Sequence, residues 1–119
     1  MSIQDIIDFA EVHTEGVHYL PDPEKLISGE PELAVYNHYS SPCGQFSAGV
    51  WEGSPGLWHI HYTEHEYCEL LSGVVVLRDE AGNAKTLHAG DRFVIPGGFK
   101  GTWEVVESCR KIYALFDSK

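Results

Sequence analysis

The stretch GSPGLWHIHYTEHEYCELLSG, from Gly53 to Gly73, holds three histidines and three glutamates in its last fifteen residues, where the chain otherwise resembles a strand pair. Such a density of titratable side chains is unusual for strands that have to build a core. The stretch is either a metal site or the polar face of an edge hairpin exposed to water.

Strand alternation places His59 and His61 on one face of the first strand, with Ile60 and Tyr62 on the other. A short turn then reverses the chain and brings Glu66 across the hairpin from His61. Two neutral imidazoles and one carboxylate form the ligand set that suits non-haem Fe(II) and that Zn, Mn or Ni also use. These residues would suit one divalent metal ion held by His59, His61 and Glu66, but an exposed hairpin whose polar side chains simply face water explains them equally well.

The rest of the chain alternates in the same short segments, separated by turns rich in Gly, Pro, Asn and Asp. About nine short strands with a turn every 8–12 residues indicate an all-β sandwich or barrel. The predicted strands are Leu33–Tyr39, Phe46–Glu52, Leu57–Thr63, Glu66–Leu71, Val74–Arg78, Ala84–Leu87, Arg92–Ile95, Gly101–Val106 and Lys111–Phe116.

The first 28 residues lack this period-2 pattern. Gln4–Val12 fits a short helix at best, Pro21 and Pro23 interrupt regular structure, and Glu24–Ser28 adds at most a helical turn. We expect residues 1–28 to form a weakly anchored N-terminal extension and residues 29–119 to form one β-barrel domain.

Composition narrows the class of partner. The formal net charge of −10 argues against nucleic acids and anionic membranes, which recruit Lys and Arg patches. Three cysteines without a CxxC pattern favour reduced thiols in a cytoplasm. The acidic N-terminal residues do not resemble a secretory signal, and no apolar run approaches the length of a membrane span. A small-molecule substrate or ligand is the expected partner.

Two spacings carry a resemblance to a known superfamily. Gly53, five residues, His59-Ile60-His61, four residues, Glu66, six residues and Gly73 match the first signature of the cupins. Gly90, five residues and Pro96-Gly97-Gly98 match the start of the second. The chain is most similar to the (S)-ureidoglycine aminohydrolase cupin family, for example in AGDRFVIPGGFKGTWEVVE, Ala89 to Glu107. The resemblance implies a jelly-roll β-barrel of the RmlC-like type, and it favours one divalent ion (Mn, Fe, Zn or Ni) bound by His59, His61 and Glu66 on the inner face of the barrel.

The chain departs from that family at one position. Metal-binding cupins place a fourth ligand, usually His, where this sequence has Gly101, and the similar aminohydrolases have Gln there. An incomplete ligand set leaves coordination positions for water or substrate, as a catalytic metal needs, but it also lowers metal affinity.

Other residues near the predicted metal have candidate roles. Glu64 and His65 lie in the turn, where either could act as general base. Trp103 shares the strand parity of Gly101 and is expected to fill the fourth-ligand space or to form an aromatic wall. The predicted pocket consists of Cys68, Phe93, Gly101 and Trp103.

Two functions fit these features. One is a metal-dependent enzyme on a small polar metabolite, performing C–N hydrolysis by family resemblance or oxygen-dependent chemistry. The alternative is a metal-free or accessory cupin that binds a small molecule without turnover. We also expect a homodimer, because Leu33–Tyr39 lacks the charges that usually protect a free edge strand.

Overall fold

The structure, a computed structural model, describes residues 1–118, so the last residue of the predicted 29–119 domain lies outside it. Its only helical element there is a 3₁₀ turn, η1 (Ile3–Asp5), and no helix in these residues is long and apolar enough to cross a membrane. The predicted all-β class is confirmed.

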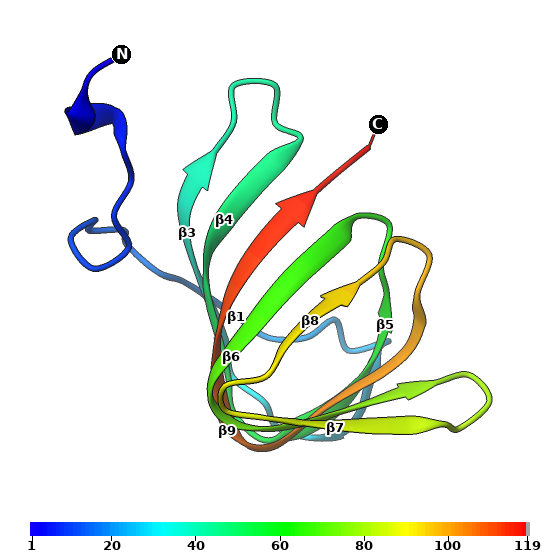
Figure 1. Ribbon diagram of the computed structural model, residues 1–119. Coiled ribbons are helices and arrows are strands. Elements are labelled where there is room, and N and C mark those ends of the chain that lie inside the picture. The colour runs from blue at the N-terminus through cyan, green and yellow to red at the C-terminus, as the bar shows by residue number, and fades with distance from the viewer. Residues whose placement is uncertain (119) are drawn as a thin grey trace.

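Nine strands form one strongly curled sheet (Figure 1). Their bounds are β1 (Val17–Tyr19), β2 (Leu26–Gly29), β3 (Leu33–Ser40), β4 (Phe46–Gly53), β5 (Gly56–His61), β6 (His65–Asp79), β7 (Ala84–His88), β8 (Arg92–Ile95) and β9 (Lys100–Phe116).

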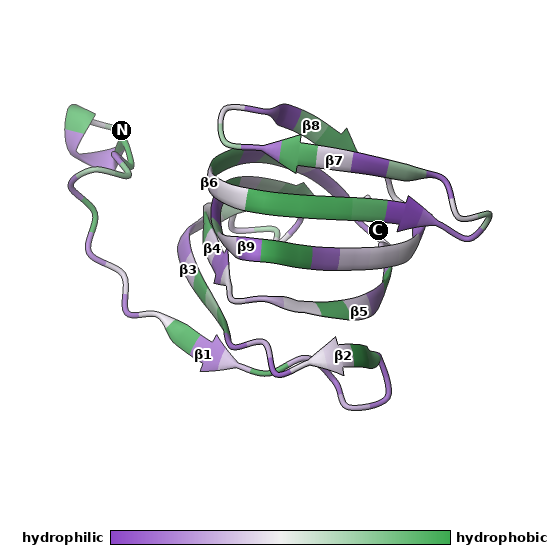
Figure 2. Ribbon diagram, turned by 90° about the horizontal axis from the view of Figure 1, so that it is seen from below, coloured by the Kyte–Doolittle hydropathy of each residue, from purple (hydrophilic) through white to green (hydrophobic). Residues whose placement is uncertain are grey.

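The two longest strands, β6 and β9, pair antiparallel along most of their length and hold the sheet together. On its other side β9 pairs with β5 through its first half and with β4 through its second half. β7 and β8 extend the sheet from β6, while β3 and β1 follow β4 and β2 follows β5. Figure 2 shows the strands bending around an interior, with hydrophobic segments in the middle of β6 and β9. The result is a jelly-roll barrel.

Strand boundaries differ from the prediction at Gly73. The sequence predicts a turn there, but Gly73 lies inside β6 with φ = 89° and forms part of an irregular register opposite β9. Only glycine adopts this backbone conformation without strain, and a Cβ here would meet the Ser108 carbonyl oxygen at 2.4 Å. A bulge therefore bends one long strand where the sequence indicates two short ones, and β9 likewise joins two predicted strands.

The first 28 residues contribute two strands that the sequence does not predict. β1 pairs with β3 through Leu33–Val35, and β2 pairs with β5 through Gly56–Trp58. Both strands are too short, at three and four residues, for an alternating pattern to be recognised. Backbone pairing thus joins β1 and β2 to the barrel, and the division into a weakly anchored extension and a barrel domain stays a prediction.

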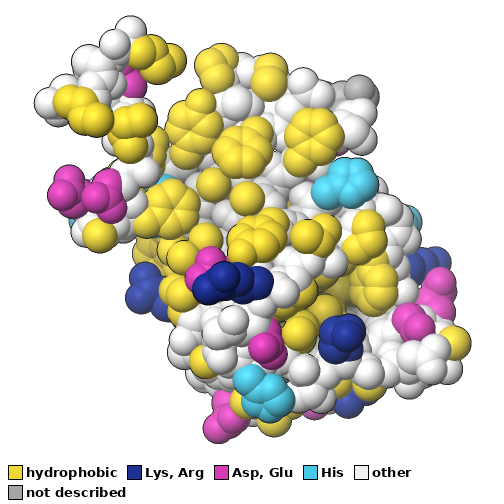
Figure 3. All heavy atoms as spheres, in the orientation of Figure 1, with side chains coloured by type: hydrophobic (Ala, Val, Ile, Leu, Met, Phe, Trp, Pro, Cys, Tyr) yellow, Lys and Arg dark blue, Asp and Glu magenta, His cyan; other side chains and the backbone are white. Residues whose placement is uncertain are grey.

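Hydrophobic side chains are also exposed outside the core. Figure 3 shows a face on which they gather over β3, β4 and β9. By strand parity Tyr39, Phe46, Tyr67 and Phe116, each between 38% and 46% exposed, lie on the side of the sheet opposite to the interior. The homodimer stays a prediction, and β1 already covers the start of its proposed edge, β3.

Candidate functional site

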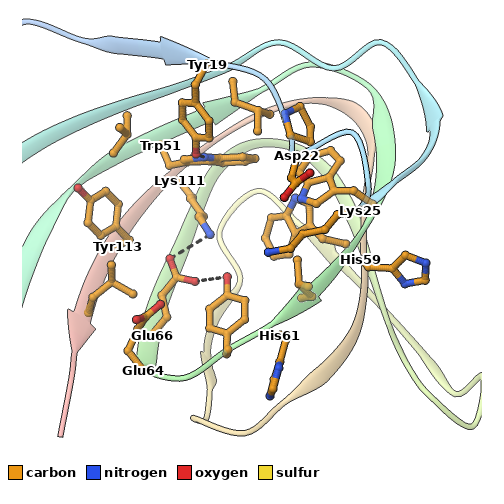
Figure 4. A pocket seen from close by; sticks show the side chains of 18 of the residues that line it. Tyr19, Asp22, Lys25, Trp51, His59, His61, Glu64, Glu66, Lys111 and Tyr113 are labelled. Carbon is orange, nitrogen blue, oxygen red and sulfur yellow. Dashed lines mark hydrogen bonds and ion pairs between the residues drawn. The ribbon is translucent and has the colours of Figure 1, made fainter. Parts of the chain in front are cut away.

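A cavity of about 560 Å³ opens at one end of the barrel (Figure 4). Its walls are aromatic: Trp51 comes from β4, Trp58 from β5 and Trp103 from β9. The connection between β1 and β2 closes one side, where the Trp51 indole nitrogen donates a hydrogen bond of 2.7 Å to the Tyr19 hydroxyl. The volume lies within the range of small-molecule sites.

β5 presents the opposite face to the one expected. Trp58 is 7% exposed and Ile60 and Tyr62 pack against the core, whereas His59 and His61 are exposed. Figure 4 shows both imidazoles directed away from the cavity, although both residues lie on its border. The prediction that the histidines face inward is wrong. Burying Trp58 and Ile60 stabilises the fold by roughly 1.5–3 kcal/mol per side chain. Burying the two neutral imidazoles in their place would stabilise it less, because they are smaller and more polar.

Glu66 does face inward and is 4% exposed, but its partners are not the histidines. One carboxylate oxygen lies 3.1 Å from the ammonium of Lys111 on β9, and the other accepts a hydrogen bond of 2.5 Å from the Tyr62 hydroxyl. Both oxygens are therefore occupied by protein groups. A buried carboxylate needs such partners, because desolvation without them costs several kcal/mol.

Lys111 is the cation at the centre of this site. Its ammonium lies 4.4 Å from the ring centroid of Trp103 and 5.0 Å from that of Trp51. Burial lowers the Lys111 pKa, but the neighbouring groups Tyr62, Glu66 and Cys68 raise it more, so the net shift is upward. The amine stays protonated at neutral pH and supplies a fixed positive charge inside the barrel.

These residues do not fit the predicted metal. A divalent ion needs converging, deprotonated ligands, and here an ammonium occupies the space beside the only carboxylate of the predicted set. Within residues 1–118 no three His, Cys, Asp or Glu side chains come together as a metal site requires. Metal binding itself stays a prediction without a test.

The fourth-ligand position has no space for a side chain. A Cβ on Gly101 would meet the carbonyl oxygen of Arg78 on β6 at 1.9 Å, which requires the backbone to shift. Trp103, two residues on, is 2% exposed and faces inward as the strand parity predicts. It is both core and cavity wall, packing edge-on against Trp51 at 5.8 Å.

The two other predicted pocket residues lie outside the cavity wall. Cys68 is fully buried, with its sulfur 3.8 Å from the Lys111 ammonium. Burial raises the pKa of the Cys68 thiol to about 12, which keeps it neutral and unreactive. Phe93 on β8 packs against the core from the far side and lines a separate cavity near Leu77 and Phe99.

The two predicted catalytic residues lie in different surroundings. Glu64 is half-buried on the cavity wall, where its carboxylate accepts a 3.5 Å hydrogen bond from the Thr63 hydroxyl. His65 is exposed and turned outward, where its Nδ1 accepts a 3.0 Å hydrogen bond from the Gly97 N–H and its ring stacks on Phe116. Only Glu64 can touch a molecule in the cavity.

Sequence reasoning missed the residues that define this site: Lys111, Tyr62, Trp51 and the Tyr19–Lys25 segment. One signal was present, because even-numbered residues from Trp58 to Tyr62 are apolar or aromatic and the odd ones are polar. Reading that alternation by hydrophobicity turns the histidines outward. Nothing local marks Lys111, which follows Arg110 in an ordinary strand.

The buried groups predict loss of stability in alkali. Burial raises the pKa of Cys68 from 9.0 to about 12 and that of Tyr113 from 10.0 to about 12, and the Lys111 pKa is also raised. The folded state holds these protons more tightly than the unfolded state, so their stabilisation is complete below about pH 9 and is lost as pH rises towards 12. We expect the free energy of unfolding in urea to fall steadily between about pH 9 and about pH 11. Cys68→Ala should show a shallower fall, and a free energy that stays level would contradict the prediction.

The fold and the cavity define a small jelly-roll barrel with an internal aromatic pocket. The chain belongs to the EutQ-like cupin domain family, whose family model matches residues 40–113. The cupin superfamily expected from the two signatures is therefore confirmed.

Solved structures agree with this assignment. A DUF861-family protein of unknown function from Pseudomonas syringae pv. tomato superposes with a TM-score of 0.78 at 27% identity, over 88% of this chain and 45% of that one. The chain thus spans less than half of that relative. A putative ethanolamine utilization protein Q from Salmonella typhimurium gives a TM-score of 0.65 at 19% identity, over 84% of this chain and 80% of that one.

A third relative is closer in sequence over a shorter region. A DUF861-family protein from Thermotoga maritima is 33% identical, with a TM-score of 0.55, over 56% of this chain and 76% of that one. No curated protein matches the chain. These relatives do not confirm the ureidoglycine aminohydrolase family.

Proposed function

We propose that this protein is a metal-free cupin that binds a small molecule in the barrel cavity. The observation that carries the proposal is the Lys111 ammonium, held between Glu66 and the faces of two tryptophans. It supplies a fixed positive charge inside the barrel. The protein would bind its ligand with that charge and the surrounding aromatic walls.

The cavity supports binding more than turnover. Its deepest titratable groups, Lys111, Glu66 and Tyr62, satisfy one another, and the Tyr62 pKa is raised by burial. A general acid or base needs a pKa near the working pH, which this cluster does not provide. The walls offer flat aromatic surface, which suits stacking of a planar ligand.

Metal stoichiometry tests the metal-free part. We expect untagged protein that is loaded with Mn, Fe, Zn or Ni and then desalted to retain well under one equivalent by mass spectrometry, with Glu66→Gln indistinguishable from wild type. His59→Ala is the control for the exposed histidine pair. If wild type retains one equivalent of metal and Glu66→Gln does not, the proposal is overturned. If only His59→Ala loses metal, that metal binds to the exposed histidines on the outer surface, and the cavity is metal-free as proposed.

Ligand binding is tested separately by a fragment screen that reads the melting temperature. Fragments that fill the cavity should raise the melting temperature of wild type, because they bind the folded state alone. Val35→Trp places a large side chain in the cavity wall and should abolish these shifts. A screen without hits, or hits that Val35→Trp does not affect, would refute the binding function.

A further inference from the structure

Three charged side chains that line the cavity, Asp22, Lys25 and Glu64, form no ion pair within residues 1–118. In this described part of the chain no carboxylate lies within 4.0 Å of the Lys25 ammonium, and no cation lies within that distance of the Glu64 carboxylate. Lys111 and Glu66 line the same cavity but form an ion pair, with 3.1 Å between the ammonium nitrogen and a carboxylate oxygen.

The backbone holds Lys25 at the mouth of the cavity. Its N–H donates to the Asp22 carbonyl oxygen at 2.9 Å, and its carbonyl oxygen accepts the His59 N–H at 2.9 Å. Figure 4 shows the Lys25 side chain reaching into the cavity from one side, while Glu64 lies on the other side, next to Glu66 in this view. Asp22 is on the Lys25 side, but its carboxylate accepts the Glu24 N–H at 3.0 Å and makes no ion pair with Lys25.

Apolar side chains line the same cavity: Leu33, Val35, Trp51, Trp58 and Leu115. A ligand that reaches from Lys25 to Glu64 therefore meets a cation at one end, a carboxylate at the other and hydrophobic side chains along the cavity wall.

We propose that the ligand is a small zwitterion with a flat apolar body, its carboxylate bound by Lys25 and its ammonium or amidinium bound by Glu64. This ligand class rests on the proposed binding function. A molecule with a carboxylate alone would leave Glu64 unpaired and would enter a protein of net charge −10. A molecule with an amine alone would face Lys25 and the Lys111 ammonium.

Three matched probes test the ligand class by isothermal titration calorimetry: 4-(aminomethyl)benzoate, 4-methylbenzoate and 4-methylbenzylamine. They share one ring and differ only in their charged ends. We expect the zwitterion to bind about tenfold more tightly than either of the others, because each singly charged probe lacks one charge-assisted hydrogen bond that the zwitterion makes.

Two variants assign the ends. Lys25→Gln should weaken 4-(aminomethyl)benzoate about tenfold and leave 4-methylbenzylamine unweakened, and Glu64→Gln should weaken the zwitterion while sparing 4-methylbenzoate. Lys85→Gln and Glu107→Gln, which lie outside the cavity, are the matched controls and should change nothing. A singly charged probe that binds as tightly as the zwitterion overturns the ligand class but keeps the binding function. No binding by any probe overturns the ligand class, and the fragment screen then decides the binding function on its own.

Discussion

Lys111→Met should lower the free energy of unfolding by about 3–5 kcal/mol at neutral pH, the cost of leaving a buried carboxylate without its cation. Methionine fills most of the volume of the lysine stem, so the loss reports the charge rather than a void. Glu66, 4% exposed, would keep the Tyr62 hydroxyl as a hydrogen-bond donor but would lose its cation. For a domain of this size the loss is a large share of total stability. Urea denaturation measures it directly.

The double variant Lys111→Met/Glu66→Gln separates the charge from the packing. Removing both charges of a buried pair is often neutral, and the glutamine carbonyl can still accept the Tyr62 hydrogen bond. We therefore expect the double variant to recover most of the stability that Lys111→Met loses. If the free energy of unfolding of Lys111→Met lay within about 1 kcal/mol of wild type, the Lys111–Glu66 pair would be open to water and Lys111 would be an ordinary surface lysine.

Trp103→Ala should lower the free energy of unfolding by about 3–5 kcal/mol, because it removes a large side chain that belongs both to the core and to the cavity wall. The indole is 2% exposed, packs edge-on against Trp51 and lies beneath the Lys111 ammonium at 4.4 Å. Its loss would weaken the aromatic surroundings of the buried cation as well as the core. The melting temperature and the urea midpoint should both fall.

Trp103→Phe and Val106→Ala are the controls for this prediction. Within residues 1–118 the indole nitrogen of Trp103 has no hydrogen-bond partner, so phenylalanine gives up volume but no hydrogen bond and should cost clearly less than alanine. Val106 lies on the same strand at 48% exposure and should tolerate alanine nearly unchanged. Equal tolerance at positions 103 and 106 would show that Trp103 is not part of the core.

Much of the fold was predictable because strands from β3 onwards alternate locally. Segments such as Phe46–Glu52 and Arg92–Ile95 agree with β4 and β8 to within a residue. The N-terminal strands were not predictable, since β1 and β2 exist through pairing with β3 and β5 rather than through their own pattern. Gly73 was misread because a glycine marks a turn and a bulge equally well in a sequence.

The candidate site was predictable only in part. Glu66 was expected at the interior, and it is there, but its partner Lys111 lies far along the chain on β9. The metal prediction requires the side chains of His59 and His61 to face the interior of the barrel. The structure instead turns the apolar side chains of Trp58 and Ile60 to the interior. Chemistry suggested by a motif depends on which face is buried, and hydrophobic burial decides that face.

By itself, the sequence determined an all-β sandwich or barrel, because alternation and turn residues act locally, and its two signature spacings added the resemblance to the cupins. Only the tertiary structure decided what fills the barrel. The pairing of β6 with β9 puts Glu66 opposite Leu115 and Lys111 opposite Leu70, and the buried side chains of Glu66 and Lys111 meet at 3.1 Å, while the close approach of Arg78 to Gly101 excludes a side chain there. A buried charge takes whichever partner the register brings close enough to compensate its desolvation, and here that partner is an ammonium group.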